Sequence, residues 1–339
     1  MVCRKWFRQR ESAPQRRTPL DTTEKELNWL KPKQTKAKLL SETIQGYLFI
    51  SPWLIGFLIF AAGPIVFSLI MSFTRWSLLS SPQWIGLNNY AEILLDDPLV
   101  YKSLWNTAYY VLFSVPLGVG FSLALAMLLN QKLKGMRFFR TIYFLPSVTN
   151  LVAISILWMW IFNPEFGLLN RVLAMIGIEG PLWLQSEVWS KPALILMSLW
   201  GVGGGMIINL AALQGIPQEL YEAAEIDGAP SWRRTIHITL PLISPAIFFN
   251  LVMNVIGSFQ VFTQAFVMTA TAAQGQEGGP NNSTLFFVLY LYKKAFQQFK
   301  MGYASALAWV LFVIILIFTL IQFRLSKRWV YYESGETRN

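Results

Sequence analysis

Uncharged polar side chains recur along one apolar stretch of the chain. Steps of three or four residues separate Asn250, Asn254, Gly257, Val261 and Gln264, and Ser258 lies beside them. In a helix, such steps place side chains on one face. Amides and hydroxyls are costly against lipid, and they match the hydroxyl groups of a sugar. The stripe therefore predicts either a binding surface for a hydroxyl-rich molecule or hydrogen bonds between helices, and the residues alone favour neither.

The rest of the sequence contains no residue pattern that is typical of a catalytic or metal site. His237 is the only histidine, and no cluster of His, Asp or Glu lies near an apolar stretch. No G-x-x-x-x-G-K-[S/T] sequence is present to bind the phosphates of a nucleotide. Cys3 is the only cysteine, so an internal disulfide is excluded. We therefore expect no catalytic residue, no metal site and no cofactor bound by this chain, which argues against a membrane-embedded enzyme.

Six long apolar runs must position the polar stripe, and none of them contains Asp, Glu, Lys, Arg or His. The runs are Ile44–Ser72, Leu104–Leu129, Ile142–Phe162, Ala193–Leu213, Pro245–Ala270 and Tyr303–Phe323. A helix that crosses a bilayer needs about 20 apolar residues, because its backbone groups must be satisfied where water is absent. The composition agrees, at 54% hydrophobic and 14% charged residues. The sequence predicts an all-α, polytopic membrane protein with six transmembrane helices.

The basic residues predict how these helices are oriented. Most of the 28 Lys and Arg residues precede the first run, lie in the second and fourth loops, or follow the sixth run. Positive loops stay in the cytoplasm, so both termini are expected there. We expect a basic cytoplasmic tail over residues 1–43, predicted to be disordered, a transmembrane domain over 44–323 and a cytoplasmic tail over 324–339. The net charge of +10 then reflects a protein of the inner (plasma) membrane, surrounded by lipid, and not a nucleic-acid partner.

The fourth loop, residues 215–244, contains more structure than a connection needs. Pro217 suits the first position of a helix, and Gly228 followed by Pro230 suits its end. Ser231 is predicted to cap a second helix that runs back to the membrane. Four residues at helical spacing form a narrow face whose small side chains would let another surface approach closely: Leu220, Ala223, Ala224 and Asp227. The loop predicts either a docking site or a helix lying on the membrane.

Two further segments carry local signals. A glycine run at positions 201 and 203–205 predicts close packing between helices or a break in the fourth helix. In the third loop, Asn163-Pro164 and Gly177 are typical of turns and predict a short helix over Leu168–Met175.

The segment Glu222-Ala223-Ala224, followed after two residues by Asp227-Gly228-Ala229, resembles the EAA loop of binding-protein-dependent ABC importer permeases. The flanking motifs resemble the carbohydrate permeases of the maltose and glycerol-3-phosphate type. These motifs are Asn106-Thr107, Leu145-Pro146, Gly167-Leu168-Leu169-Asn170, Ala212 to Pro217, Gly278-Gly279-Pro280 with Ser283-Thr284, and Gly302 to Ala306. The resemblance covers about 45–324. Thr235 replaces the usual Phe, which puts packing against the ATPase in doubt, and Ala272–Glu277 looks like an insertion.

The resemblance implies a role for each group. An ATPase subunit would contact Glu222, Ala223, Ala224, Asp227, Gly228 and Ala229. The sugar site would include Asn254, Ser258 and Val261 after the loop and Ser198, Trp200 and Val202 before it, and the stripe adds Asn250 and Gln264.

The same resemblance implies the partners. They are a second, homologous permease in a heterodimer, two ATPase subunits that bind ATP and Mg, and an extracytoplasmic solute-binding protein. The expected substrate is a sugar or related polyol. A glycerol-3-phosphate importer and an ATP-independent channel or facilitator remain the alternatives, and the latter has no need of the cytoplasmic helix over Glu222–Ala229.

Overall fold

The computed structural model describes residues 36–131, 133–272 and 278–331. Most of the predicted N-terminal tail, most of the predicted insertion and the last residues of the C-terminal tail lie outside these ranges. The chain divides into two compact units, Met1–Ile65 and Val66–Asn339. The described part of the first unit is helical, with α2 (Lys36–Phe57), a π-helical segment (Leu58–Ala62) and the start of α3 (Gly63–Ser72), which leads into the second unit.

The described part of the second unit is mostly helical and has almost no strands, which confirms the all-α prediction at this coarse level. Its helices after α3 are α4 (Asn88–Ala91), α5 (Pro98–Leu129), α6 (Met136–Val148), α7 (Leu151–Ile161), α8 (Leu168–Met175), α9 (Ser190–Trp200), α10 (Gly203–Gln214), α11 (Gln218–Ile226), α12 (Ser231–Arg234), α13 (Leu240–Leu242), α14 (Ser244–Phe259), α15 (Thr263–Ala272), α16 (Phe287–Tyr292) and α17 (Met301–Ser326). Short π-helical or 3₁₀ segments lie at Glu92–Asp96, Trp183–Gln185, Thr235–Thr239, Pro280–Asn282 and Lys293–Gln297. Strands β1 (Thr74–Arg75) and β2 (Gln83–Trp84) pair antiparallel, with Thr74 opposite Trp84.

By length and composition, three of the described helices can cross a membrane, and three bent helix pairs fit either a broken span or a re-entrant loop. The bends are 102° between α6 and α7, 45° between α9 and α10, and 66° between Ser231–Leu242 and α14. The prediction of one continuous helix is therefore wrong for the third run, while the break in the fourth run is one of the two outcomes that its glycines predicted. The prediction is also wrong for the fifth run, where α14 ends at Phe259 and α15 begins at Thr263.

The glycine run produces both outcomes that the sequence predicted. The helix breaks between α9 and α10, directly before Gly203. A Cβ atom on Gly203 would clash with the carbonyl of Tyr143, and one on Gly205 would lie 3.3 Å from Ser122 Oγ and 3.4 Å from Asn250 Oδ1. Glycine at these positions therefore lets α10 approach α5, α6 and α14 closely.

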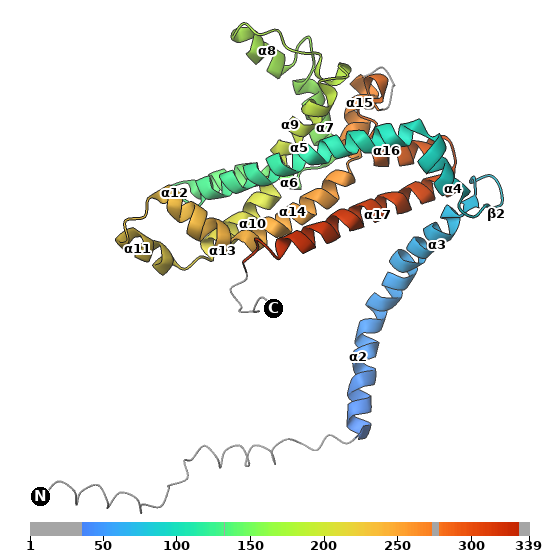
Figure 1. Cartoon of the computed structure of the whole chain (residues 1–339), viewed down its shortest axis with the longest axis horizontal. Coiled ribbons are helices and arrows are strands. Elements are labelled where there is room, and N and C mark those ends of the chain that lie inside the picture. Colours follow the sequence, from blue (N-terminus) through green and yellow to red (C-terminus); the bar gives the residue numbers. More distant parts are fainter. Residues whose placement is uncertain (1–35, 132, 273–277, 332–339) are drawn as a thin grey trace, which may run out of the picture. The chain divides into compact units, whose positions relative to one another are not determined.

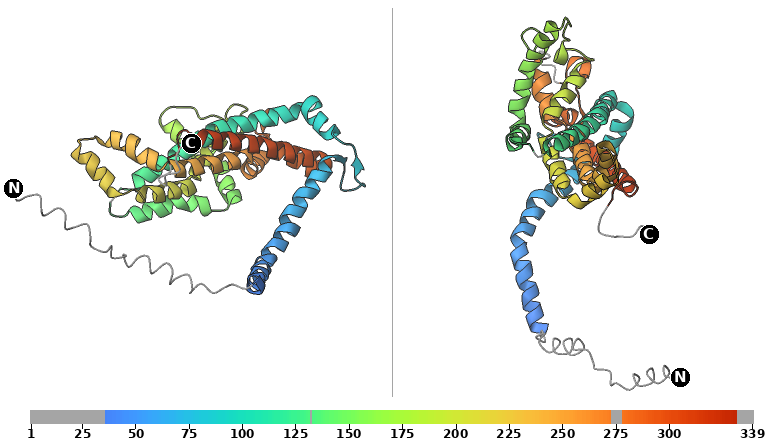
Figure 2. Two further views of the ribbon diagram at one scale, coloured as in Figure 1. Left: turned by 60° about the horizontal axis from the view of Figure 1, so that its bottom comes forward. Right: turned by 90° about the vertical axis from the view of Figure 1, so that its left-hand side faces the viewer.

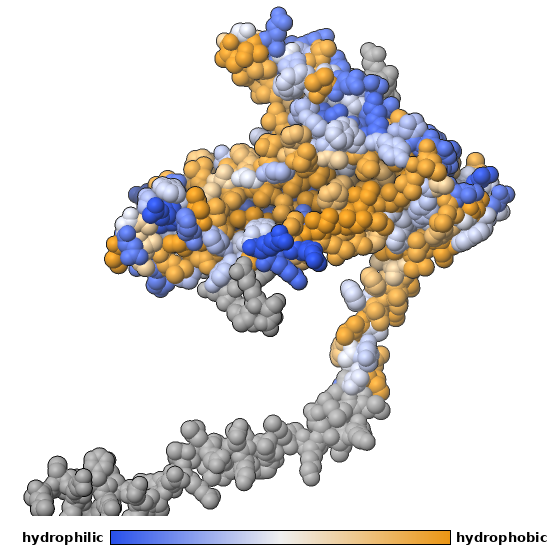
Figure 3. Space-filling model, in the orientation of Figure 1, coloured by the Kyte–Doolittle hydropathy of each residue, from blue (hydrophilic) through white to orange (hydrophobic). Residues whose placement is uncertain are grey.

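The long helices α5, α10, α14 and α17 run along one another in the second unit (Figures 1 and 2). Helix α5 contacts α9, α10 and α14, and α14 also contacts α17. Helices α11 and α12 lie at one end of this bundle, and α4 with the β hairpin lies at the other (Figure 1). Apolar side chains cover most of α17 and α5, while hydrophilic side chains gather at the two ends of the bundle and where α17 ends (Figure 3). This distribution is typical of helices embedded in a bilayer.

A buried carboxylate ties the α4 end of the bundle together. Asp97 caps α5 by accepting a hydrogen bond from the Leu99 N–H at 3.1 Å. Its other oxygen accepts from the Tyr290 and Tyr303 hydroxyls and lies 3.3 Å from Lys294 Nζ. Burial by itself would raise the pKa of Asp97, but the two hydroxyl donors and the Lys294 charge outweigh it and hold the pKa below its ordinary value. The network joins α5 to α16 and α17.

Two motifs that carry the family resemblance form one structural unit. Asn106 Nδ2 donates to the carbonyls of Asn282 at 2.8 Å and Leu285 at 3.1 Å. Thr107 Oγ1 accepts a hydrogen bond from the Phe287 N–H at 3.0 Å. These side chains of α5 therefore hold in place the segment that follows Gly278-Gly279-Pro280, far away in the sequence.

Candidate functional site

An open pocket of about 550 Å³ is lined by residues of α5, α9, α10, α14 and α15. Six of the eight side chains expected at a substrate site line it: Ser198, Asn250, Asn254, Ser258, Val261 and Gln264. Gly257 also belongs to the lining. The polar stripe thus lies along one pocket, although the helix that was expected to carry it is interrupted between α14 and α15.

The other two expected residues lie outside this pocket. Trp200, with 52% of its surface exposed, lines a neighbouring pocket of about 330 Å³ that shares Ser198 and Gln264 with the first. Val202 lies in the break between α9 and α10 and packs against an apolar cluster that includes Leu125 and Met206. A contact between Val202 and substrate remains a prediction.

Asn250 contributes mainly to packing between helices. Its side chain is 2% exposed. Its Nδ2 donates to Asn209 Oδ1 at 2.9 Å and to the Gly205 carbonyl at 3.3 Å. Asn209 Nδ2 in turn donates to Ser122 Oγ at 3.3 Å. At Asn250 the geometry thus favours hydrogen bonding between helices. Sequence analysis missed Asn209 and Ser122, because each is an isolated polar residue in another apolar run.

The side chains of Asn254 and Ser258 form fewer hydrogen bonds to other helices than that of Asn250. Asn254 Nδ2 donates to the Asn250 carbonyl one turn earlier, at 2.8 Å. Within the part of the chain that the structure describes, Asn254 Oδ1 accepts no hydrogen bond. Ser114 Oγ lies 3.3 Å from Ser258 Oγ, which is a weak contact. Both side chains therefore keep hydrogen-bonding capacity for a molecule in the pocket.

Tyr110 on α5 is a further lining residue that the sequence did not reveal. Its side chain is 3% exposed, and Ser198 and Gln264 line the same pocket. Ser198 Oγ donates to the Ile195 carbonyl at 2.6 Å, so it remains free to accept. A single tyrosine in an apolar run has no periodic partner, and no signal in the sequence separates it from an ordinary buried aromatic residue.

The pocket can bind a neutral polar molecule. Its described lining contains amides, hydroxyls and apolar side chains but no Asp, Glu, Lys, Arg or His. Such groups donate and accept hydrogen bonds in both directions, as a hydroxyl-rich ligand requires. They offer no charge to neutralise an anion and no group to transfer a proton.

The second candidate site is the coupling loop, residues 215–244, at the α11 end of the bundle. Helix α11 ends in a Schellman motif. The Ala229 N–H donates to the Ala224 carbonyl at 2.9 Å, and the Gly228 N–H donates to the Glu225 carbonyl at 3.0 Å. Gly228 takes a φ of +71°, which favours glycine. The predicted helix end at Gly228 is confirmed, and Gly228 and Ala229 have a structural role there.

The start of each helix in this loop differs from the prediction. Helix α11 begins at Gln218, and Pro217 occupies the capping position. Ser231 is the first residue of α12 and not its cap, so the predicted capping role of Ser231 is wrong. Pro230 occupies the capping position in an extended conformation, with φ −67° and ψ 156°. Ser231 Oγ instead lies 3.3 Å from Arg234 Nη2, a donor in the same turn.

Two contacts hold the halves of the coupling loop together. The Tyr221 hydroxyl lies 2.9 Å from Thr239 Oγ1, and Arg234 Nη1 lies 3.6 Å from Glu225 Oε2. Thr235, which departs from the family pattern, donates from Oγ1 to the Ser231 carbonyl at 3.1 Å. Its hydroxyl is thus satisfied within its own helix, where a Phe would present a ring.

The outer surface of the coupling loop is exposed and mixed in character. Glu222, Ala223 and Asp227 are exposed, and Gln218 Nε2 donates to Glu222 Oε1 at 2.8 Å. Large apolar side chains lie beside them, with Ile226 87% and Trp232 59% exposed. An apolar patch bordered by charged residues is typical of a protein interaction surface.

Comparison with known proteins identifies the family to which the chain belongs. Residues 117–331 match the family described as the binding-protein-dependent transport system inner membrane component. The chain is 45% identical to the probable ABC transporter permease protein YesP of Bacillus subtilis, over 87% of this chain and 94% of that protein. It is 35% identical to the arabinooligosaccharides transport system permease protein AraP of Bacillus subtilis, over 83% of this chain and 88% of that protein.

A solved structure has the same fold. A chain of a bacterial ABC transporter that imports the acidic polysaccharide alginate matches with a TM-score of 0.75 and 25% identity, covering 86% of this chain and 98% of that one. The family match includes the coupling loop and every pocket-lining residue except Tyr110. The protein therefore belongs to the family of binding-protein-dependent transport system inner membrane components, the permeases of ABC importers.

Proposed function

We propose that this permease carries a sugar or a related polyol across the membrane in an ATP-driven importer. The observation that carries the proposal is the pocket, because six of the expected residues line it and its described lining is polar without being charged. The arabinooligosaccharide permease among the relatives supports a sugar. A glycerol phosphate would favour Arg or Lys in the pocket, so it is the less favoured substrate.

The proposed topology has six membrane spans with both termini in the cytoplasm. Three long helices and three bent pairs are compatible with six spans if each pair counts as one. The basic residues around the coupling loop and beyond α17 support the cytoplasmic side for that end. We keep residues 1–43 as the N-terminal tail, 44–323 as the transmembrane domain in the inner membrane, and 324–339 as the C-terminal tail.

The proposed partners follow from the open rim of the pocket and the exposed surface of the coupling loop. The pocket is open at a rim where Phe249 is 50% and Met253 is 53% exposed, so a second, homologous permease would complete it in a heterodimer. The coupling loop would dock on one of two ATPase subunits, which would bind ATP and Mg. A solute-binding protein would deliver the sugar at the opposite end of the bundle, near α4 and the β hairpin.

The experiment that tests the proposal identifies these partners. The tagged chain is extracted in mild detergent and its companions are identified by mass spectrometry. We expect an ATPase and a second permease of the same family to co-purify. A chain that emerges alone, or only with copies of itself, would contradict the proposal and favour an ATP-independent facilitator.

A further inference from the structure

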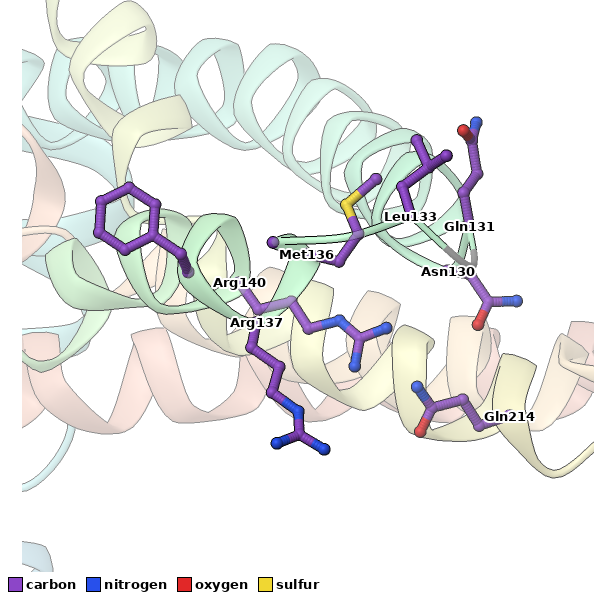
Figure 4. A pocket seen from close by; sticks show the side chains of 9 residues that line it. Asn130, Gln131, Leu133, Met136, Arg137, Arg140 and Gln214 are labelled. Atoms are coloured by element: carbon purple, nitrogen blue, oxygen red, sulfur yellow. The ribbon is translucent and has the colours of Figure 1, made fainter.

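A basic pocket that shares no residue with either site described above lies where the end of α5, the start of α6 and the end of α10 meet (Figure 4). Its volume is about 610 Å³, which is ample for a phospholipid headgroup. The polar groups that line it are Asn130, Gln131, Arg137, Arg140 and Gln214. None of them lines the candidate substrate pocket.

The two arginines give this pocket its chemistry. In Figure 4 the Arg140 side chain extends toward Asn130 and Gln214, and the Arg137 side chain projects from α6 beside it. The described lining contains no Asp or Glu. Neither arginine forms an ion pair within residues 36–131, 133–272 and 278–331. Two guanidinium groups without an acidic partner favour an oxyanion, and phosphate suits their fork of donors.

Arg140 is already held in place. Its Nη2 donates to the Leu129 carbonyl at 2.9 Å and its Nε lies 3.3 Å from the same oxygen. That carbonyl belongs to the last turn of α5, so the contact fixes the guanidinium at the pocket wall. A guanidinium carries more N–H donors than these two. Arg137 is exposed and completes the pair from the preceding turn of α6.

The rim of the pocket indicates where the oxyanion comes from. Leu133 is 60% and Phe138 is 66% exposed, and both line the pocket. Phe139 beside them is 49% exposed. Large apolar side chains next to paired arginines match a molecule with acyl chains below a phosphate. A free anion in water would gain nothing from this apolar rim.

We propose that the pocket formed by α5, α6 and α10 binds the phosphate of an anionic phospholipid headgroup between Arg137 and Arg140. The bound lipid connects the start of α6 with Gln214, the residue before the coupling loop.

The test uses the full permease with the subunits that co-purify with it. The complex is reconstituted in nanodiscs of phosphatidylcholine containing a minor fraction of phosphatidylglycerol, released, and its retained lipid is measured by native mass spectrometry. The variants are Arg137→Gln, Arg137→Lys and, as a matched control, Arg328→Gln, which removes an exposed arginine beyond α17. Assembly of each variant is checked by size-exclusion chromatography.

We expect Arg137→Gln to retain about tenfold less phosphatidylglycerol than the wild type, as loss of one charge-assisted contact predicts. Arg137→Lys should fall between them, and Arg328→Gln should match the wild type. Equal retention by the wild type and Arg137→Gln would overturn the proposal, as would equal losses in Arg137→Gln and Arg328→Gln. Displacement of the lipid by inorganic phosphate at low concentration would show that the pocket takes a free anion and would overturn the lipid assignment.

Discussion

The coupling loop and the substrate pocket are built by opposite means. Helix α11 is ended by hydrogen bonds between residues at most five apart, such as Ala229 with Ala224, and its outer face is exposed. The pocket depends on contacts such as that of Asn250 with Asn209, which lie 41 residues apart. The coupling loop is an exposed surface whose structure is determined by contacts between residues close in sequence. The pocket forms only when five helices, α5, α9, α10, α14 and α15, have packed together. Substitutions in the coupling loop should therefore reduce transport in a folded protein, whereas substitutions among the buried contacts of the pocket should reduce stability.

The largest effect should come from reversing a charge on the coupling loop. We expect Glu222→Lys to reduce uptake of the sugar to background, because an exposed Lys would oppose docking of the ATPase, while the chain remains inserted and folded. Uptake in cells and membrane insertion by protease mapping are the measurements. Glu165→Lys, at an exposed position between α7 and α8, is the matched control. Normal uptake by Glu222→Lys would remove the coupling role.

The next effect should be structural and should lie in the bundle. Asn250→Leu removes the Nδ2 donor that lies 2.9 Å from the buried side-chain oxygen Asn209 Oδ1. We therefore expect the free energy of unfolding to fall by about 1–3 kcal/mol. Thermal unfolding of the detergent-solubilised protein measures this loss. Met253→Leu, on the exposed rim of the same helix, should have little effect. An unchanged melting temperature for Asn250→Leu would show that the Asn250 contact does not hold the helices together.

Asn254→Leu should separate function from folding within the same helix. Because Asn254 Oδ1 is unused in the described structure, we expect uptake at limiting sugar to fall about tenfold, the equivalent of one hydrogen bond, with the melting temperature preserved. Asn254→Gln, which keeps the amide, should retain part of the uptake. If Asn254→Leu transports normally over a range of sugar concentrations, Asn254 contributes only to packing.

The smallest effect should come from the helix end in the coupling loop. Ala at Gly228, where φ is +71°, costs roughly 1–2 kcal/mol. We expect Gly228→Ala to loosen α11 locally and to lower uptake partially. Hydrogen exchange of the α11 amides reports the loosening. Gly215→Ala, where φ is −81°, is the control. Equal rates of amide exchange in both variants would show that the Schellman motif does not stabilise α11.

The sequence predicted locally determined features better than features that depend on tertiary packing. The short helix Leu168–Met175 was predicted with its observed bounds, because turn signals flank it. Gly228 was identified as a helix end for a similar local reason. Ser231 was assigned wrongly, since Pro230 already provides the extended residue before α12.

Features that depend on tertiary packing were harder to predict. The break between α14 and α15 falls on Gln260, Val261 and Phe262, which include neither Gly nor Pro. Tyr110 and Asn209 gave no periodic signal, because a single polar residue in an apolar run resembles any other. Only the packed bundle brings them to the polar stripe.

The central claim is that one chain combines an ATPase-driven coupling loop with a neutral sugar pocket. The most direct test reconstitutes the purified complex in vesicles with its sugar-loaded binding protein outside and ATP inside. The wild type should accumulate sugar only with ATP, and Glu222→Lys should not accumulate it under either condition. Sugar entry at the same rate without ATP, or unimpaired by Glu222→Lys, would contradict the account.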